Sequence, residues 1–142
     1  MPTRHAKAEW QGDLRSGKGT VEVESGAFSG RYSFGSRFES ATGTNPEELV
    51  GAAEAGCFSM AFSGVLTEAG FPPEDIETSA AVTVEKQGDG FTITKIDLVT
   101  DAVVPGIDAE TFRKSAESAK AGCPMSKALT GVTITLKANL HD

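Results

Sequence analysis

The sequence has little of several residue types that commonly mark a function. Its 142 residues include two cysteines, two histidines and no marked run of lysine or arginine. A formal net charge of -7 repels phosphate backbones and anionic lipid surfaces, so nucleic acid is not expected as a partner. His5 and His141 lie near the chain ends, where a four-ligand zinc site would have to use frayed termini. We therefore expect no metal.

Export signals and long apolar runs are not expected either. Residues 1–10 lack the apolar stretch of about 7–15 residues that a secretory signal contains. We further expect no stretch of the ~20 apolar residues that a membrane span requires. Two cysteines without an export signal favour reduced thiols over a structural disulfide. The prediction is a cytoplasmic protein that does not enter a membrane.

Internal repeats and low-complexity linkers are missing too, and the glycines are spread among the turns. Residues 1–142 are therefore predicted to form a single domain, folding alone or with a second copy. Expected strands lie at 6–11, 20–24, 32–39, 79–86 and 91–101, with a last one from Val132. Expected helices lie at 46–69, 109–121 and 124–129. This order predicts an α+β fold with a largely antiparallel sheet packed on a long central helix.

Local signals support several of these elements. Asn45 can cap the long helix, with Pro46 at its first position. Residues 87–90, Gln-Gly-Asp-Gly, predict a hairpin, and the changed parity of the apolar residues after them predicts a bulge near Thr94 and Lys95. Asp108 can cap the second helix. Gly51 and Gly56 inside the long helix indicate a close neighbour or space for a ligand.

The two cysteines are the main candidates for chemistry. Cys57 lies midway along the long helix among small apolar residues, where a buried core thiol is the alternative to a nucleophile. Cys123 lies between Gly122 and Pro124 at a helix start, where amide groups and the helix dipole favour a thiolate.

Peroxide reduction needs a thiolate, a fixed cation that stabilises it and a second thiol that resolves the sulfenic acid. Arginine suits the cation role, because it stays protonated and offers a planar fork of donors that a carboxylate can orient. Arg37, with an acid from Glu47, Glu48 or Glu54, is the candidate.

Several runs of residues resemble one known family. They are Arg37-Phe38-Glu39, residues 43–49 (GTNPEEL), 55–61 (AGCFSMA), 94–96 (TKI), 104–108 (VPGID) and 119–124 (AKAGCP). In order and spacing they resemble the OsmC (osmotically inducible) branch of the OsmC/Ohr hydroperoxide reductases, over nearly the whole chain.

This resemblance implies an intertwined homodimer and a thiol-dependent peroxidase without a metal or organic cofactor. It implies that organic hydroperoxides, and hydrogen peroxide more weakly, are reduced through a sulfenic acid on Cys57 that Cys123 resolves. Arg37 and Glu47 match the pair that activates the thiolate. Electrons would come from a dithiol, for example one on a lipoyl group.

Glu54 is a departure from the family, three residues before Cys57 on the same helical face. A carboxylate there would raise the thiol pKa, unless it faces solvent or pairs with a cation. Glu47 precedes Cys57 by ten residues, or about 15 Å along an unbroken helix. Either the helix breaks near Gly51, or the acid comes from an antiparallel helix of a second subunit, which we prefer.

Apolar side chains near the thiols, Phe58, Met60 and Met125, are expected to form a substrate pocket, with core packing as the alternative. The main rival function is a dimeric stress protein that binds an apolar ligand at its interface without catalysis. A second rival, a disulfide oxidoreductase acting on proteins, is disfavoured because the sequence has no C-x-x-C spacing.

Overall fold

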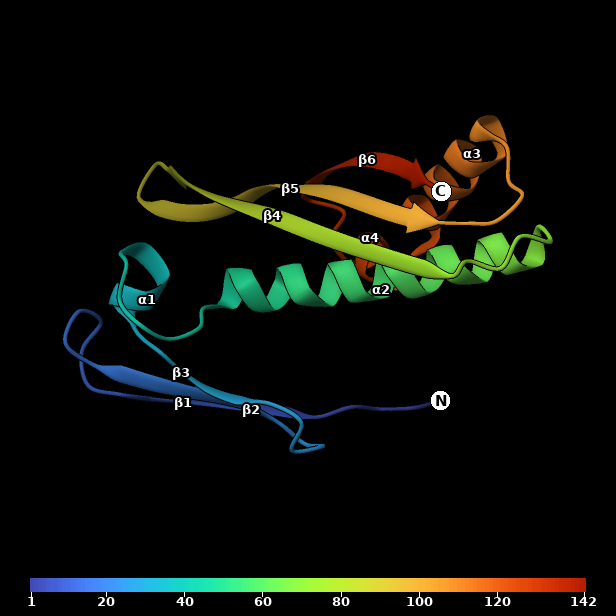
Figure 1. Ribbon diagram of the computed structural model, residues 1–142. Helices are drawn as coiled ribbons and strands as arrows, with labels where there is room; N and C mark the ends of the chain where they lie inside the picture. The colour runs from blue at the N-terminus through green and yellow to red at the C-terminus, as the bar shows by residue number, and fades with distance from the viewer. The chain divides into compact units, whose positions relative to one another are not determined.

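The computed structural model describes residues 1–142, which divide into two compact units, Met1–Leu49 and Val50–Asp142. The first unit contains an antiparallel sheet of β1 (Ala6–Gln11), β2 (Lys18–Val23) and β3 (Ser29–Tyr32), followed by the short helix α1 (Phe34–Phe38) (Figure 1). Gly19 of β2 stands opposite both Trp10 and Tyr32, whose ring centroids are 5.5 Å apart. A Cβ atom on Gly19 would lie 2.5 Å from the Tyr32 ring, so only glycine lets both rings pack there.

The predicted strand at 32–39 is wrong beyond Tyr32, because helix α1 follows it. The backbone N–H of Ser36 donates to the Ser33 hydroxyl, and the backbone N–H of Ser33 donates to the Ser36 hydroxyl. This reciprocal pair is a capping box with serine in the place of the usual Glu or Gln. It starts a helical turn that carries Arg37.

Helix α2 (Pro46–Glu68) begins where Asn45 predicts, since the backbone N–H of Glu48 donates to the Asn45 side chain at 2.8 Å. Its buried residues recur every three or four positions and therefore share one face. They are Glu47, Gly51, Glu54, Phe58, Phe62 and Leu66. The exposed residues between them include Ala52, Gly56, Met60 and Gly64.

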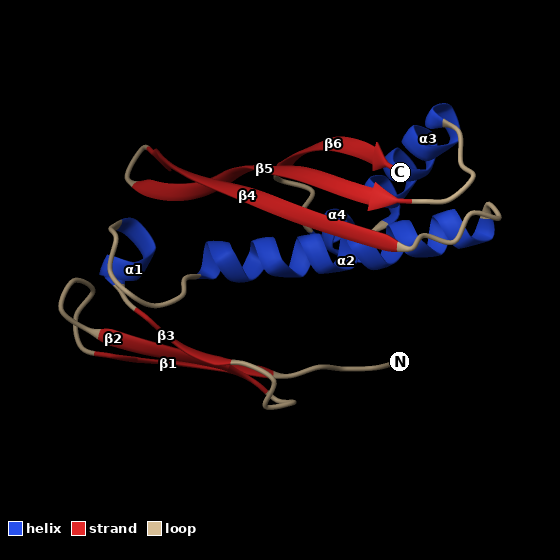
Figure 2. Ribbon diagram, in the orientation of Figure 1, coloured by secondary structure: helices blue, strands red, loops and turns tan.

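The second unit contains a sheet of β4 (Asp75–Gln87), β5 (Gly90–Val103) and β6 (Thr133–His141), in that order (Figure 2). Helices α3 (Ala109–Gly122) and α4 (Pro124–Ala128) come between β5 and β6 in the chain. The hairpin of β4 and β5 and its bulge are confirmed: Thr83 faces Lys95 and Val84 faces Ile93, which leaves Thr94 as the extra residue. The last strand, β6, lies parallel to β5.

The core of this unit lies between the sheet and the helices. The Phe62 ring packs at a tilt against Phe58 and against Phe112 of α3, with ring centroids 5.5 and 5.4 Å apart. Ile96 and Leu98 of β5 join the same buried cluster. The α+β class with a long helix is confirmed, with two three-stranded sheets where one was expected.

One expectation about membranes needs correction. By length and composition, α2 is able to cross a membrane: its most apolar 18 residues have a mean hydropathy of 1.5, and 28% of that stretch is buried in the chain. Core helices of soluble proteins satisfy the same criterion, so this property does not place α2 in a membrane.

Candidate functional site: a pair of free thiols

The second unit brings the two cysteines into contact. Cys57 lies in the middle of α2 and Cys123 lies between α3 and α4, 66 residues further along the chain. Both are free thiols, and the Cys123 thiol donates a hydrogen bond to the Cys57 sulfur at 2.7 Å. Cys57 is half-buried, whereas Cys123 is completely buried. This contact is the arrangement that a reversible disulfide needs.

The position of Cys123 follows from the local sequence. It ends α3 by donating its backbone N–H to the Ala119 carbonyl, and it is also the residue before α4. Pro124 occupies the first position of α4, where its missing N–H is not needed. As predicted, a helix end and a helix start therefore meet at this cysteine, and they direct its thiol toward α2.

The surroundings of Cys57 in the second unit oppose its ionisation. Burial raises the pKa of the Cys57 thiol, and the adjacent Cys123 sulfur and the charge of Glu54 raise it further. A backbone hydrogen bond from Met125 acts in the opposite direction. No cation contributes to this balance, so a reactive thiolate requires a positive group from elsewhere.

Glu54 is not a solvated acid, and it does not pair with a cation. Its side chain is completely buried, and its Oε1 atom accepts a hydrogen bond from the Ser126 hydroxyl at 2.6 Å. Its Oε2 atom is buried without a hydrogen-bond partner. The helical spacing to Cys57 marks Glu54 as a neighbour of the thiol, but no sequence pattern indicates Ser126, which lies 72 residues away.

Arg37 and Glu47 form an ion pair within the first unit. The Nε and Nη2 atoms of Arg37 donate to Glu47 Oε1 at 2.9 and 2.8 Å, and Nε also lies 3.2 Å from Oε2. Glu47 is buried, whereas the Arg37 side chain is 37% exposed. Among the three acids considered, Glu47 is thus the one that orients Arg37 and leaves part of the guanidinium free for an anion. Glu48 instead donates its backbone N–H to the Asn45 cap at the start of α2.

The three predicted pocket residues do not share one environment. Phe58 belongs to the core, as the alternative interpretation held, while Met60 is 81% exposed on another face of α2. Met125 is half-buried beside Cys57.

Helix α2 is continuous from Pro46 to Glu68, so it does not break near Gly51. Gly51 meets the expected close neighbour, since a Cβ atom there would lie 3.1 Å from Val82 Cγ2. Gly56 instead faces open space.

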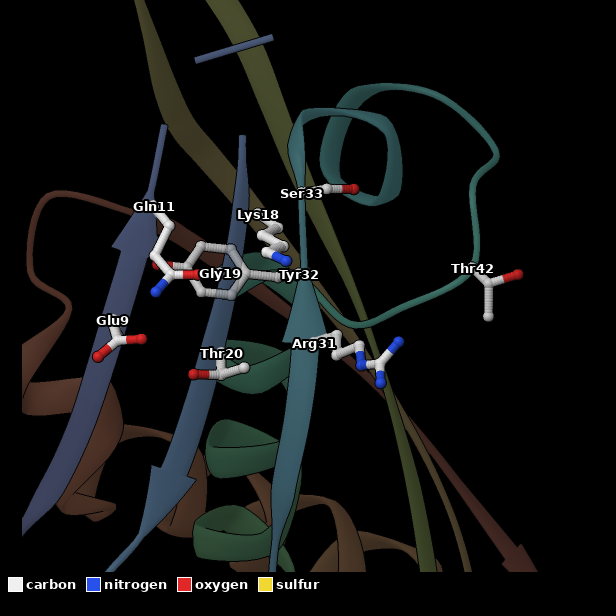
Figure 3. Close-up of a pocket in the computed structure, with 9 residues that line it drawn as sticks. All are labelled: Glu9, Gln11, Lys18, Gly19, Thr20, Arg31, Tyr32, Ser33 and Thr42. Atoms are coloured by element: carbon white, nitrogen blue, oxygen red, sulfur yellow. The ribbon is translucent and has the colours of Figure 1, made fainter. Parts of the chain in front are cut away.

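A separate cavity of about 400 Å³ lies on the sheet of the first unit. Lys18 and Thr20 of β2 and Arg31 and Tyr32 of β3 line it, together with Glu9 of β1 (Figure 3). It contains neither thiol nor the Arg37–Glu47 pair.

An α+β fold that holds two free thiols in contact defines a two-cysteine redox protein. The chain belongs to the OsmC family: the family pattern described as OsmC-like protein matches residues 39–137, which confirms the resemblance seen in the sequence. It is 54% identical over 140 residues to "Peroxiredoxin OsmC" of Escherichia coli (strain K12), covering 98% of this chain and 97% of the relative.

Two further relatives agree. Identity is 32% over 101 residues with an "Organic hydroperoxide resistance protein-like" of Staphylococcus aureus (strain USA300), covering 70% of this chain and 71% of that one. The crystal structure of an organic hydroperoxide resistance protein OsmC from Legionella pneumophila superposes with a TM-score of 0.75 at 25% identity, covering 98% of each chain.

Proposed function

We propose that this protein is a thiol-dependent peroxidase that reduces organic hydroperoxides to alcohols, with Cys57 as the attacking residue and Cys123 as the resolving residue. The observation that carries the proposal is the 2.7 Å contact between two free thiols on different helices. Relatives named as a peroxiredoxin and as organic hydroperoxide resistance proteins support the choice of substrate. The exposure of the thiols supports the roles, because half-buried Cys57 can meet a peroxide and buried Cys123 can meet only Cys57.

The reaction proceeds in two steps on these sulfurs. The Cys57 thiolate attacks one peroxide oxygen, the O–O bond breaks, and the departing alkoxide takes a proton to become an alcohol. The Cys123 thiol then attacks the sulfenic acid on Cys57, which forms the disulfide and releases water. A dithiol, which we propose is a lipoyl group in the cell, reduces the disulfide and restores both thiols.

We infer that the missing cation is Arg37 of a second copy of the chain, held by that copy's Glu47. Glu47, which holds Arg37, lies ten residues before Cys57 on the continuous helix α2, so an antiparallel partner helix could supply the pair. The exposed face of α2 suits such a neighbour, because Cβ atoms built on Gly56 and Gly64 would meet nothing within 4 Å. The functional unit proposed here is therefore a cytoplasmic homodimer, in which residues 1–142 of each chain act as a single domain.

This assignment predicts a pH effect of Arg37. The thiolate is the attacking species, so the rate of Cys57 alkylation rises with pH through the pKa of Cys57. The second unit raises this pKa, and a facing guanidinium lowers it. Arg37→Ala should therefore move the pH–rate profile of Cys57 alkylation to higher pH by about 1–3 units. The pH–rate profile is measured by alkylation with iodoacetamide in a Cys123→Ser background, and Arg31→Ala in the same background is the control. Coincident profiles for Arg37→Ala and the parent would exclude Arg37 as the cation.

The experiment that tests the function itself uses purified protein, an organic hydroperoxide and a dithiol. A peroxidase consumes hydroperoxide catalytically and oxidises the dithiol in equal amount. The rival, a protein that only binds an apolar ligand, would consume neither. Loss of hydroperoxide no faster than with the dithiol alone would overturn the proposal.

A further inference from the structure

The buried contact between Glu54 and Ser126 has no part in the two-step reaction described above. The Ser126 hydroxyl donates to Glu54 Oε1 at 2.6 Å, and the Glu54 side chain is completely buried. A buried carboxyl group without a cationic partner is unfavourable unless its hydrogen bonds compensate, and here one oxygen has no partner at all. An acid placed at this cost beside a redox site calls for a functional reason.

The contact joins the same two helical turns that carry the thiols. Glu54 lies three residues before Cys57 on α2, and Ser126 lies three residues after Cys123 on α4. The backbone of Met125 is also hydrogen-bonded to Cys57. One turn of α2 therefore meets the first turn of α4 through three contacts: thiol to thiol, backbone to thiol, and hydroxyl to carboxyl.

Helix α4 has little else to hold it in place. It is only five residues long, none of its residues is buried, and its capping residue, Cys123, makes no side-chain cap hydrogen bond. Isolated helices of this length are not stable in water. The Glu54–Ser126 bond is therefore a large share of what fixes α4, and with it Cys123, against α2.

We propose that Glu54 is a positioning residue for disulfide formation, which accepts the Ser126 hydrogen bond and so holds Cys123 in reach of oxidised Cys57. In this step, which rests on the proposed function, the Sγ–Sγ bond forms while the S–O bond of Cys57 breaks. The Cys57 sulfur is reduced and the Cys123 sulfur is oxidised. The hydroxyl group leaves with the Cys123 proton as water.

The same acid slows the first step, because the negative charge of Glu54 raises the pKa of the Cys57 thiol. Hydrogen bonding and charge can be separated, since glutamine retains an oxygen that accepts the Ser126 bond and removes the charge. In Glu54→Gln, the hydroperoxide should therefore oxidise Cys57 faster at neutral pH. The disulfide should still form at a rate within about threefold of the parent.

The test is rapid quenching of the reduced protein after one equivalent of organic hydroperoxide, with mass spectrometry to count sulfenic acid and disulfide. Glu54→Ala and Ser126→Ala should each slow disulfide formation by about tenfold or more, since each removes the bond, and Cys57 sulfenic acid should accumulate. Ser126→Thr keeps the hydroxyl and should restore the rate. Glu68→Ala, an exposed acid on the same helix, is the matched control.

Disulfide formation at the parental rate in Ser126→Ala would overturn the proposal. A second measurement does not depend on peroxidase activity: equilibrium with mixtures of reduced and oxidised glutathione gives the effective concentration of Cys123 relative to Cys57. It should fall about tenfold or more in Glu54→Ala and Ser126→Ala. A parent protein that never oxidises with hydroperoxide refutes the peroxidase function alone, and an unchanged effective concentration refutes the positioning role alone.

Discussion

Cys57→Ser should lose hydroperoxide consumption by a factor on the order of 10³ or more, the largest effect expected of any single substitution. A serine hydroxyl is not ionised near neutral pH and cannot form a sulfenic acid, so neither step of the reaction remains. The measurement is the initial rate of dithiol oxidation with an organic hydroperoxide. Far-ultraviolet circular dichroism verifies the fold, which should survive the exchange of a half-buried sulfur for oxygen.

Cys123→Ser is the matched control for this prediction, because it removes the other partner of the same 2.7 Å contact. It should keep a single rapid reaction with hydroperoxide and lose sustained turnover with the dithiol. The reverse pattern, with Cys57→Ser active in a single turnover and Cys123→Ser inert, would exchange the two assigned roles.

Chains that are inactive separately should regain activity when mixed, if each site uses residues of two chains. Glu47→Ala removes the carboxylate that holds the Arg37 fork, and Cys57→Ser removes the nucleophile. A dimer of one chain of each kind has one site with Cys57 from the first chain and the Arg37–Glu47 pair from the second. Random exchange makes about half of the dimers mixed, so about a quarter of the parental activity should return.

Mixtures that stay inactive after verified subunit exchange would place Arg37, Glu47 and Cys57 of each site in one chain. Mixing Cys57→Ser with Cys123→Ser supplies the comparison, because both cysteines of a site belong to one chain in the structure. That mixture should regain no turnover.

Elements governed by local chemistry were predictable from the sequence. The Asn45 cap, the two-residue hairpin loop and the bulge at Thr94 all follow from residues within a few positions of one another. The serine capping box of α1 is equally local, but its Ser36 stands where glutamate or glutamine is usual, so the alternation toward Phe38 predicts a strand instead. The parallel pairing of β6 depends on contacts across the whole second unit, which no local pattern encodes.

The site was predictable only as far as residue types and spacing reach. Resemblance to the family identified Cys57 and Cys123 as partners, and the structure brings them together. The buried face of α2 explains why Phe58 and Met60 do not line one pocket. Phe58 lies four residues after Glu54 on that face, whereas Met60 lies outside it. The Ser126 contact was not predictable, because burial of an acid beside a distant hydroxyl is decided by tertiary packing.

The central claim is that Cys57 takes the peroxide oxygen and Cys123 removes it, and one measurement tests this most directly. Reduced Cys123→Ser protein is treated with one equivalent of organic hydroperoxide, and the mass of the peptide that contains Cys57 is determined. The prediction is a single added oxygen on Cys57, persisting as a sulfenic acid because no second thiol resolves it. An unmodified Cys57 after the hydroperoxide has been consumed would contradict the account.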